Sequence, residues 1–138
     1  MSRVINPDST GKQRTQLSKA IVLAVRELAR QKDVTDQTRD LAAFIAIALQ
    51  IIADGIDVSV TAWEKRDYWI KADKFRMEWA WAGQIAGKMR ASVLSEDWAT
   101  VAVLSAQTAQ KLAKVQVSEN HRLGKPWVGS FKQLTLNR

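Results

Sequence analysis

The sequence predicts an all-α fold, namely an antiparallel four-helix bundle whose C-terminal tail folds back over one end. Apolar residues recur at helical spacing in four successive segments, and polar connections with helix-capping residues separate these segments. A chain of 138 residues with only two prolines is long enough to bury one hydrophobic core. We therefore expect a single domain, residues 1–138, with helices at residues 7–31, 36–54, 62–91 and 96–117 and an irregular tail at residues 118–138.

The first helix is expected to start at Asn6-Pro7-Asp8. Asparagine caps helices, proline suits the first helical position, and aspartate complements the positive end of the helix dipole. Four basic side chains then fall within about 40° of one another, opposite the apolar stripe of this helix. These residues are Lys12, Lys19, Arg26 and Arg30. The basic stripe predicts either a solvated helix face or, as an alternative, a nucleic-acid-binding surface about 27 Å long.

The second helix is expected to begin after a cap at Asp33 or Thr35 and to end at Gly55, where glycine tolerates a left-handed backbone. Its apolar run covers residues 41–53. This run is shorter than the roughly 20 residues that a membrane span requires, so it predicts a buried helix and no membrane partner.

Residues 55–60 leave two interpretations open. Thr61 and Glu64 have the spacing of a capping box, which predicts a loop before a new helix. The alternative is continuous helix, because Ile52, Ile56 and Val60 keep a helical spacing across Gly55. We favour the loop, since an unbroken helix from residue 36 to residue 91 would be about 80 Å long.

The third helix is expected to be the element around which the chain is organised. Residues 61–92 carry apolar side chains on two opposite faces of a helical wheel, whereas a surface helix of a monomer needs only one. One stripe consists of Tyr68, Ala72, Phe75, Trp79, Ala82, Ala86 and Met89. The other consists of Ile70, Met77, Trp81 and Ile85. The second stripe predicts an interface with a second copy or with another protein.

The fourth helix is expected to be capped by Ser95-Glu96-Asp97, which also places acidic side chains in its first turn. The tail after Ser118 contains glycine and proline but retains bulky apolar residues, among them Trp127, Phe131 and Leu134. Disordered tails carry little apolar bulk, so we expect these residues to pack over a bundle end, where they form a turn or two of helix.

The sequence carries no catalytic or cofactor signature. There is no cysteine, and His121 is the single histidine, so thiolate metal sites, di-iron bundles and histidine-based triads are not expected. One enzymatic alternative depends on four acidic residues, Asp54, Asp57, Glu64 and Asp67. Their spacing is similar to that of the magnesium-binding acidic pairs of all-α nucleotide pyrophosphohydrolases, and it predicts magnesium-dependent nucleotide hydrolysis.

We expect a small, non-catalytic, cytoplasmic protein that self-associates, as a homo-oligomer such as a dimer, or docks a protein partner through Ile70, Met77, Trp81 and Ile85. The formal charge of +7 is unevenly distributed, because residues 33–60 carry five acidic side chains and one basic one. Part of the positive charge is therefore expected to be compensated within the fold, which weakens the inference from high isoelectric point to a polyanionic partner.

Overall fold

The computed structural model describes residues 7–137, with side chains from residue 10 onward, and this part of the chain is all-helical. The helices are α1 (Pro7–Ala29), α2 (Asp36–Lys65), α3 (Trp69–Leu94), α4 (Trp98–Lys111) and α5 (Ser130–Leu136). The cap expected at Asn6 lies outside the described residues, and so does the side chain of Asp8. The all-α prediction is confirmed.

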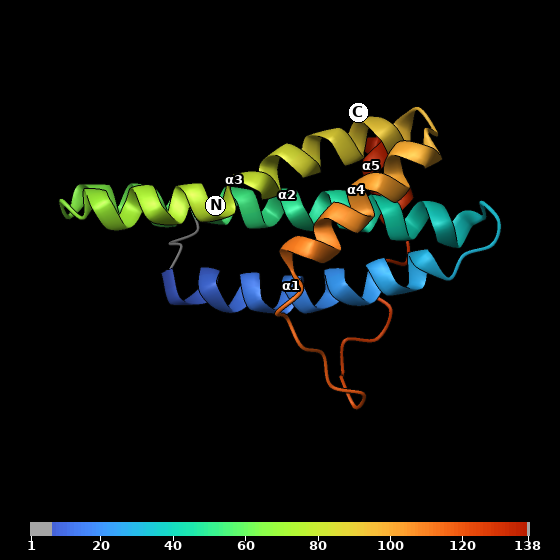
Figure 1. Cartoon of the computed structure of the whole chain (residues 1–138), viewed down its shortest axis with the longest axis horizontal. Coiled ribbons are helices and arrows are strands. Elements are labelled where there is room, and N and C mark those ends of the chain that lie inside the picture. The colour runs from blue at the N-terminus through green and yellow to red at the C-terminus, as the bar shows by residue number, and fades with distance from the viewer. Residues whose placement is uncertain (1–6, 138) are drawn as a thin grey trace.

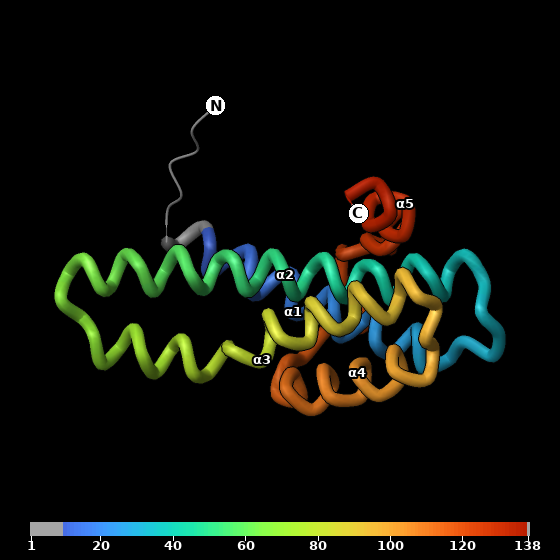
Figure 2. The backbone as a smooth tube through the Cα atoms, turned by 90° about the horizontal axis from the view of Figure 1, so that it is seen from above, coloured from blue at the N-terminus to red at the C-terminus, as the bar shows by residue number. Residues whose placement is uncertain are grey.

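Helix α2 is the centre of the fold, rather than the third helix as the sequence suggested. Helices α1, α3 and α5 all contact α2, and they lie on different sides of it (Figures 1 and 2). The side chains of Leu41, Ile45 and Leu49 are completely buried. The stripe of α1 that carries Ile21 and Ala24 packs into the same core. Surrounding one apolar helix with three others removes its surface from water, which is the main favourable contribution to folding.

The loop expected at residues 55–60 is wrong, because α2 continues through Gly55 to Lys65. The helical spacing of apolar residues prevails here, with Ile52, Ile56 and Val60 all buried in the core. A Cβ atom added at Gly55 would lie 2.8 Å from Cγ2 of Thr10 on α1. Gly55 therefore does not end the helix. It allows α1 and α2 to approach closely, which offsets the cost of about 1 kcal/mol of a glycine inside a helix.

Helices α2 and α3 form a long hairpin joined by residues 66–68. Asp67 adopts a left-handed conformation with φ of 63°, and the backbone N–H of Tyr68 donates to the carbonyl oxygen of Trp63 at 2.9 Å. The capping box expected at Thr61 and Glu64 is wrong, because both residues lie inside α2. The turn of the hairpin projects beyond the described part of α1 (Figures 1 and 2).

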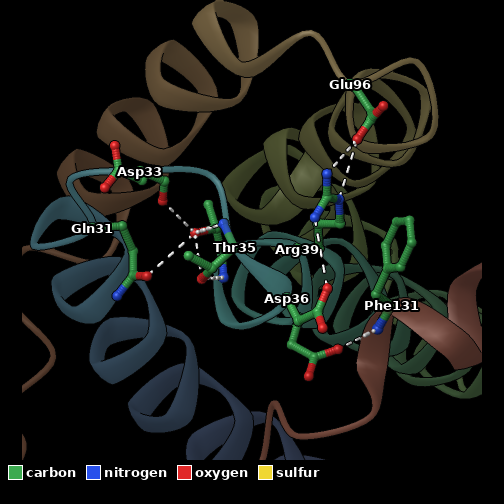
Figure 3. Close-up of polar contacts among 9 residues, drawn as sticks. Gln31, Asp33, Thr35, Asp36, Arg39, Glu96 and Phe131 are labelled. Atoms are coloured by element: carbon green, nitrogen blue, oxygen red, sulfur yellow. Dashed lines mark hydrogen bonds and ion pairs between the residues drawn. The ribbon is translucent and has the colours of Figure 1, made fainter.

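The start of α2 is capped as predicted. Thr35 is the N-cap, and it exchanges backbone and side-chain hydrogen bonds with Thr38 in a capping box. The Thr38 hydroxyl also lies 2.9 Å from the carbonyl oxygen of Asp33, and Arg39 reaches from the first turns of α2 to Glu96 at 2.9 Å (Figure 3). The start of α2 is thus tied both to the preceding loop and to the α3–α4 turn.

Helix α4 is shorter than expected, and the tail contains one short helix. Asp97 caps α4 as predicted, by accepting a hydrogen bond from the backbone N–H of Thr100. In the tail, Trp127 and Leu134 are buried in the core. Helix α5 packs across α2 (Figure 2), and Arg90 of α3 donates a hydrogen bond to the carbonyl oxygen of Asn137 at its C-terminal end.

By length and composition alone, α2 could cross a membrane. Its most apolar 18-residue window has a mean hydropathy of 2.0, and 56% of that window is buried inside the fold. The core helix of a soluble protein passes the same test. The sequence argument against a membrane span was the short apolar run at residues 41–53, which ends before Asp54, whereas the continuous helix carries further apolar residues beyond Asp54.

Candidate protein interface

The structure separates the four residues that the sequence placed in an interface. Ile70 and Met77 are among the most exposed apolar side chains, with 75% and 78% of their surface accessible. Trp81 is half-buried and stacks on Trp79 with ring centroids 5.7 Å apart. Ile85 is buried in the core. The exposed part of the predicted stripe therefore lies in the N-terminal half of α3.

Two aromatic residues extend this exposed surface toward the turn of the hairpin. Tyr68 and Trp69 expose about half of their surface, 52% and 55%. The sequence placed Tyr68 in the first apolar stripe of the third helix, which is wrong because Tyr68 is the N-cap of α3 and lies in the turn. The projecting end of the hairpin thus combines aromatic and aliphatic surface, a composition that is enriched in protein interfaces.

One continuous face of α3 is exposed along most of its length, and we call it the outer face of α3. It covers about 100° of the helical wheel, and in Figure 2 no other helix lies beyond the N-terminal half of α3 on the side away from α2. Its members are all exposed. They are Ile70, Asp73, Met77, Ala80, Gln84, Gly87, Lys88 and Ala91.

An aromatic layer beneath the exposed residues holds α3 in place. The rings of Trp63 and Phe75 meet edge to face with centroids 4.9 Å apart, which joins α2 to α3. The guanidinium of Arg14 on α1 lies over Phe75 at 4.9 Å and over Trp79 at 5.8 Å. Burial lowers the pKa of Arg14, and the charge of Glu78 acts in the opposite direction. A cation packed on two rings fixes the N-terminal half of α1 against the hairpin.

Ion pairs flank the aromatic layer. Arg76 pairs with Glu64 at 3.0 Å and with Asp73 at 2.7 Å. The hydrogen bond to Glu64 is the main reason that the pKa of Arg76 lies above its ordinary value. Because all three groups are solvent-accessible, this network contributes little to stability and acts mainly to orient the side chains beside the outer face.

The acidic residues of the enzymatic alternative do not gather into a metal site. Asp54 accepts a hydrogen bond from Gln50, and Glu64 is engaged by Arg76. Among the residues that the structure describes, no three histidine or acidic side chains are grouped so that they could hold a metal ion. His121 is exposed, in the segment after α4, and its Nδ1 accepts a hydrogen bond from the backbone N–H of Leu123.

The basic stripe of α1 is only partly available to a ligand. Lys12 and Arg26 are exposed, whereas Lys19 is half-buried. Arg30 lies just beyond the end of α1 and pairs with Glu27 at 2.9 Å. The nucleic-acid alternative remains a prediction, supported mainly by Lys12 and Arg26, which are exposed and form no ion pair among the described residues.

A groove lies between α2, α3 and α5, away from the turn of the hairpin. Its volume is about 400 Å³, and its lining includes Ile47, Ile51 and Leu134. The charged group at its rim is Arg90, which already donates a hydrogen bond to the carbonyl oxygen of Asn137. The groove thus offers mainly apolar surface, and its polar lining residues are Gln50, Arg90, Gln133 and Asn137.

Comparisons of the chain with protein-family models, with curated proteins and with solved structures found no match.

Proposed function

We propose that this chain is a non-catalytic, cytoplasmic helical protein that acts through protein–protein interaction, with self-association as the preferred form. In this proposal the four longer helices serve as an antiparallel bundle closed by the C-terminal tail, and the outer face of α3 is the contact surface. The observation that carries the proposal is the exposure of Ile70 and Met77, at 75% and 78%, on one face of a helix that is firmly packed from behind.

Burial of these side chains would favour association. Full transfer of an isoleucine or methionine side chain from water contributes about 1.5–3 kcal/mol. In a dimer with two-fold symmetry each contact occurs twice, so Ile70 and Met77 supply four such side chains. Most large apolar side chains on α3 are at least half-buried, and a surface helix has no folding reason to expose two further ones on a shared stripe.

The test compares the molecular mass in solution of the wild type with that of two charged variants. Met77→Asp should abolish association, as measured by sedimentation velocity at several concentrations. Val103→Asp is the matched control, because Val103 on α4 is also exposed, at 57%, but lies outside the hairpin. Its association should equal that of the wild type. A wild type that stays monomeric at high micromolar concentration would rule out self-association.

A different protein partner is the second form of the proposal. It would be supported by a purified partner that binds the monomer and is released by Met77→Asp but not by Val103→Asp. Equal binding of the two variants would exclude the outer face of α3 as the contact surface.

A further inference from the structure

The apolar residues on the outer face of α3 become smaller toward the C-terminal end of the helix. Its N-terminal half carries Ile70 and Met77, and its C-terminal half carries the smaller Gly87 and Ala91. An antiparallel pair of such helices places the large end of one copy against the small end of the other. With a two-fold axis between Ala80 and Trp81, Ile70 faces Ala91 of the second copy, and Met77 faces Gln84.

The charged residues of the outer face are also complementary in this antiparallel arrangement. Asp73 and Lys88 are the charged members of the outer face, and the same axis places Asp73 of one copy opposite Lys88 of the other. None of the ion pairs among the described residues involves Lys88, whereas Asp73 already pairs with Arg76 of its own chain at 2.7 Å. A parallel, in-register pair would instead place Asp73 against Asp73 and Lys88 against Lys88, which is unfavourable.

The C-terminal half of the face also permits close approach of a second backbone. A Cβ atom added at Gly87 would meet nothing within 4 Å, so the space above it is open in the single chain. Exposed glycine and alanine let two helices approach toward the lower end of the usual interaxial distance of 8–10 Å. At such distances the long side chains of the facing half reach across the contact.

From these three features we infer that a second copy of this chain packs antiparallel on the outer face of α3, with the two-fold axis passing between Ala80 and Trp81. This inference rests on the proposed function, because it specifies the partner and the register of the same surface. The contact line from Ile70 to Ala91 is about 32 Å long. Because the same patch serves both copies, the assembly closes at the dimer.

The experiment is a charge reversal measured by sedimentation equilibrium. Asp73→Lys and Lys88→Asp should each weaken dimerisation about tenfold or more, because each reversal acts at two symmetric contacts. The double variant Asp73→Lys/Lys88→Asp restores opposite charges and should recover dimerisation to near the wild-type level. Lys111→Asp, at an exposed site on α4, is the control for net charge and should leave dimerisation unchanged. Circular dichroism of each variant checks that the helices are intact.

The outcomes separate this inference from the proposed function. If the wild type dimerises and Met77→Asp is monomeric, but the double variant associates no better than the single variants, the register is overturned and the proposed function stands. If the wild type is monomeric, both self-association and the register are overturned. Recovery in the double variant, with both single variants weakened, supports the antiparallel dimer.

Discussion

The carboxylate of Asp40 on α2 accepts a hydrogen bond of 2.9 Å from the backbone N–H of Phe131, in the first turn of α5, 91 residues later in the chain (Figure 3). Its other oxygen accepts a hydrogen bond from the backbone N–H of Gly129, the N-cap of α5, at 3.1 Å. Gly129 has no side chain with which to cap the helix. A residue of the central helix therefore supplies the cap of the last one, and an acidic group suits the positive end of a helix dipole.

We expect Asp40→Ala to lower the free energy of unfolding by about 1–2 kcal/mol, because it leaves two backbone donors of α5 without their acceptor. Hydrogen exchange should accelerate in residues 129–136 before it does so elsewhere. Asp57→Ala is the control, since Asp57 is an exposed acid on the same helix and its loss changes the net charge equally. Equal exchange rates in the tail of the two variants would show that Asp40 does not hold α5.

Replacement of Gly55 and of Gly87 by alanine should change the free energy of unfolding in opposite directions. Gly55→Ala should destabilise the fold by about 1–3 kcal/mol, because the new Cβ overlaps the methyl group of Thr10. Gly87→Ala should stabilise the monomer by up to about 1 kcal/mol, since alanine favours the helix and nothing obstructs its Cβ. Chemical denaturation measures both. Thr10→Ser removes the obstructing methyl and should rescue Gly55→Ala; no rescue would contradict the close approach of α1.

These glycines also show what the sequence could and could not reveal. Periodicity correctly indicated an all-helical chain and a buried second helix. Capping residue types correctly indicated Asp97 and left Asp33 and Thr35 as alternatives, of which Thr35 is the cap. Periodicity could not decide the role of Gly55, because a glycine that ends a helix and one that admits a neighbouring helix look alike without the position of Thr10. Likewise, Ile70 and Ile85 fall on the same stripe of the wheel, and only the tertiary packing distinguishes the exposed residue from the buried one.

The N-cap of α4 should give stability a defined pH dependence. Hydrogen bonds from Thr100 lower the pKa of Asp97 below its ordinary value of 3.8. A carboxyl whose pKa is lower in the folded state stabilises the fold above its unfolded pKa, and this stabilisation is lost as the pH falls through the folded pKa. The difference in unfolding free energy between wild type and Asp97→Asn should therefore be largest near neutral pH and shrink below about pH 4. A difference that is constant from pH 7 to pH 3 would contradict this account.

Arg14 should stabilise the hairpin through its contact with two aromatic rings. Arg14→Ala is expected to cost about 0.5–2 kcal/mol, because it removes the cation over Phe75 and Trp79 together with the packing of its stem. Lys12→Ala, on the same helix but exposed, is the control and should change stability by less than about 0.5 kcal/mol. Thermal unfolding of both variants measures the difference, and equal melting temperatures would argue against the contact.

The most direct test of the central claim is oxidation footprinting of the methionines at increasing protein concentration. Met77 lies at the centre of the proposed contact and is 78% exposed in the single chain, whereas Met89 is completely buried and serves as an internal reference. Conversion of Met77 to its sulfoxide should be fast at low protein concentration and should slow markedly as the protein associates, while Met89 stays protected throughout. A rate at Met77 that does not change with concentration, in a sample shown to be oligomeric, would place the contact elsewhere and contradict the role of the outer face of α3.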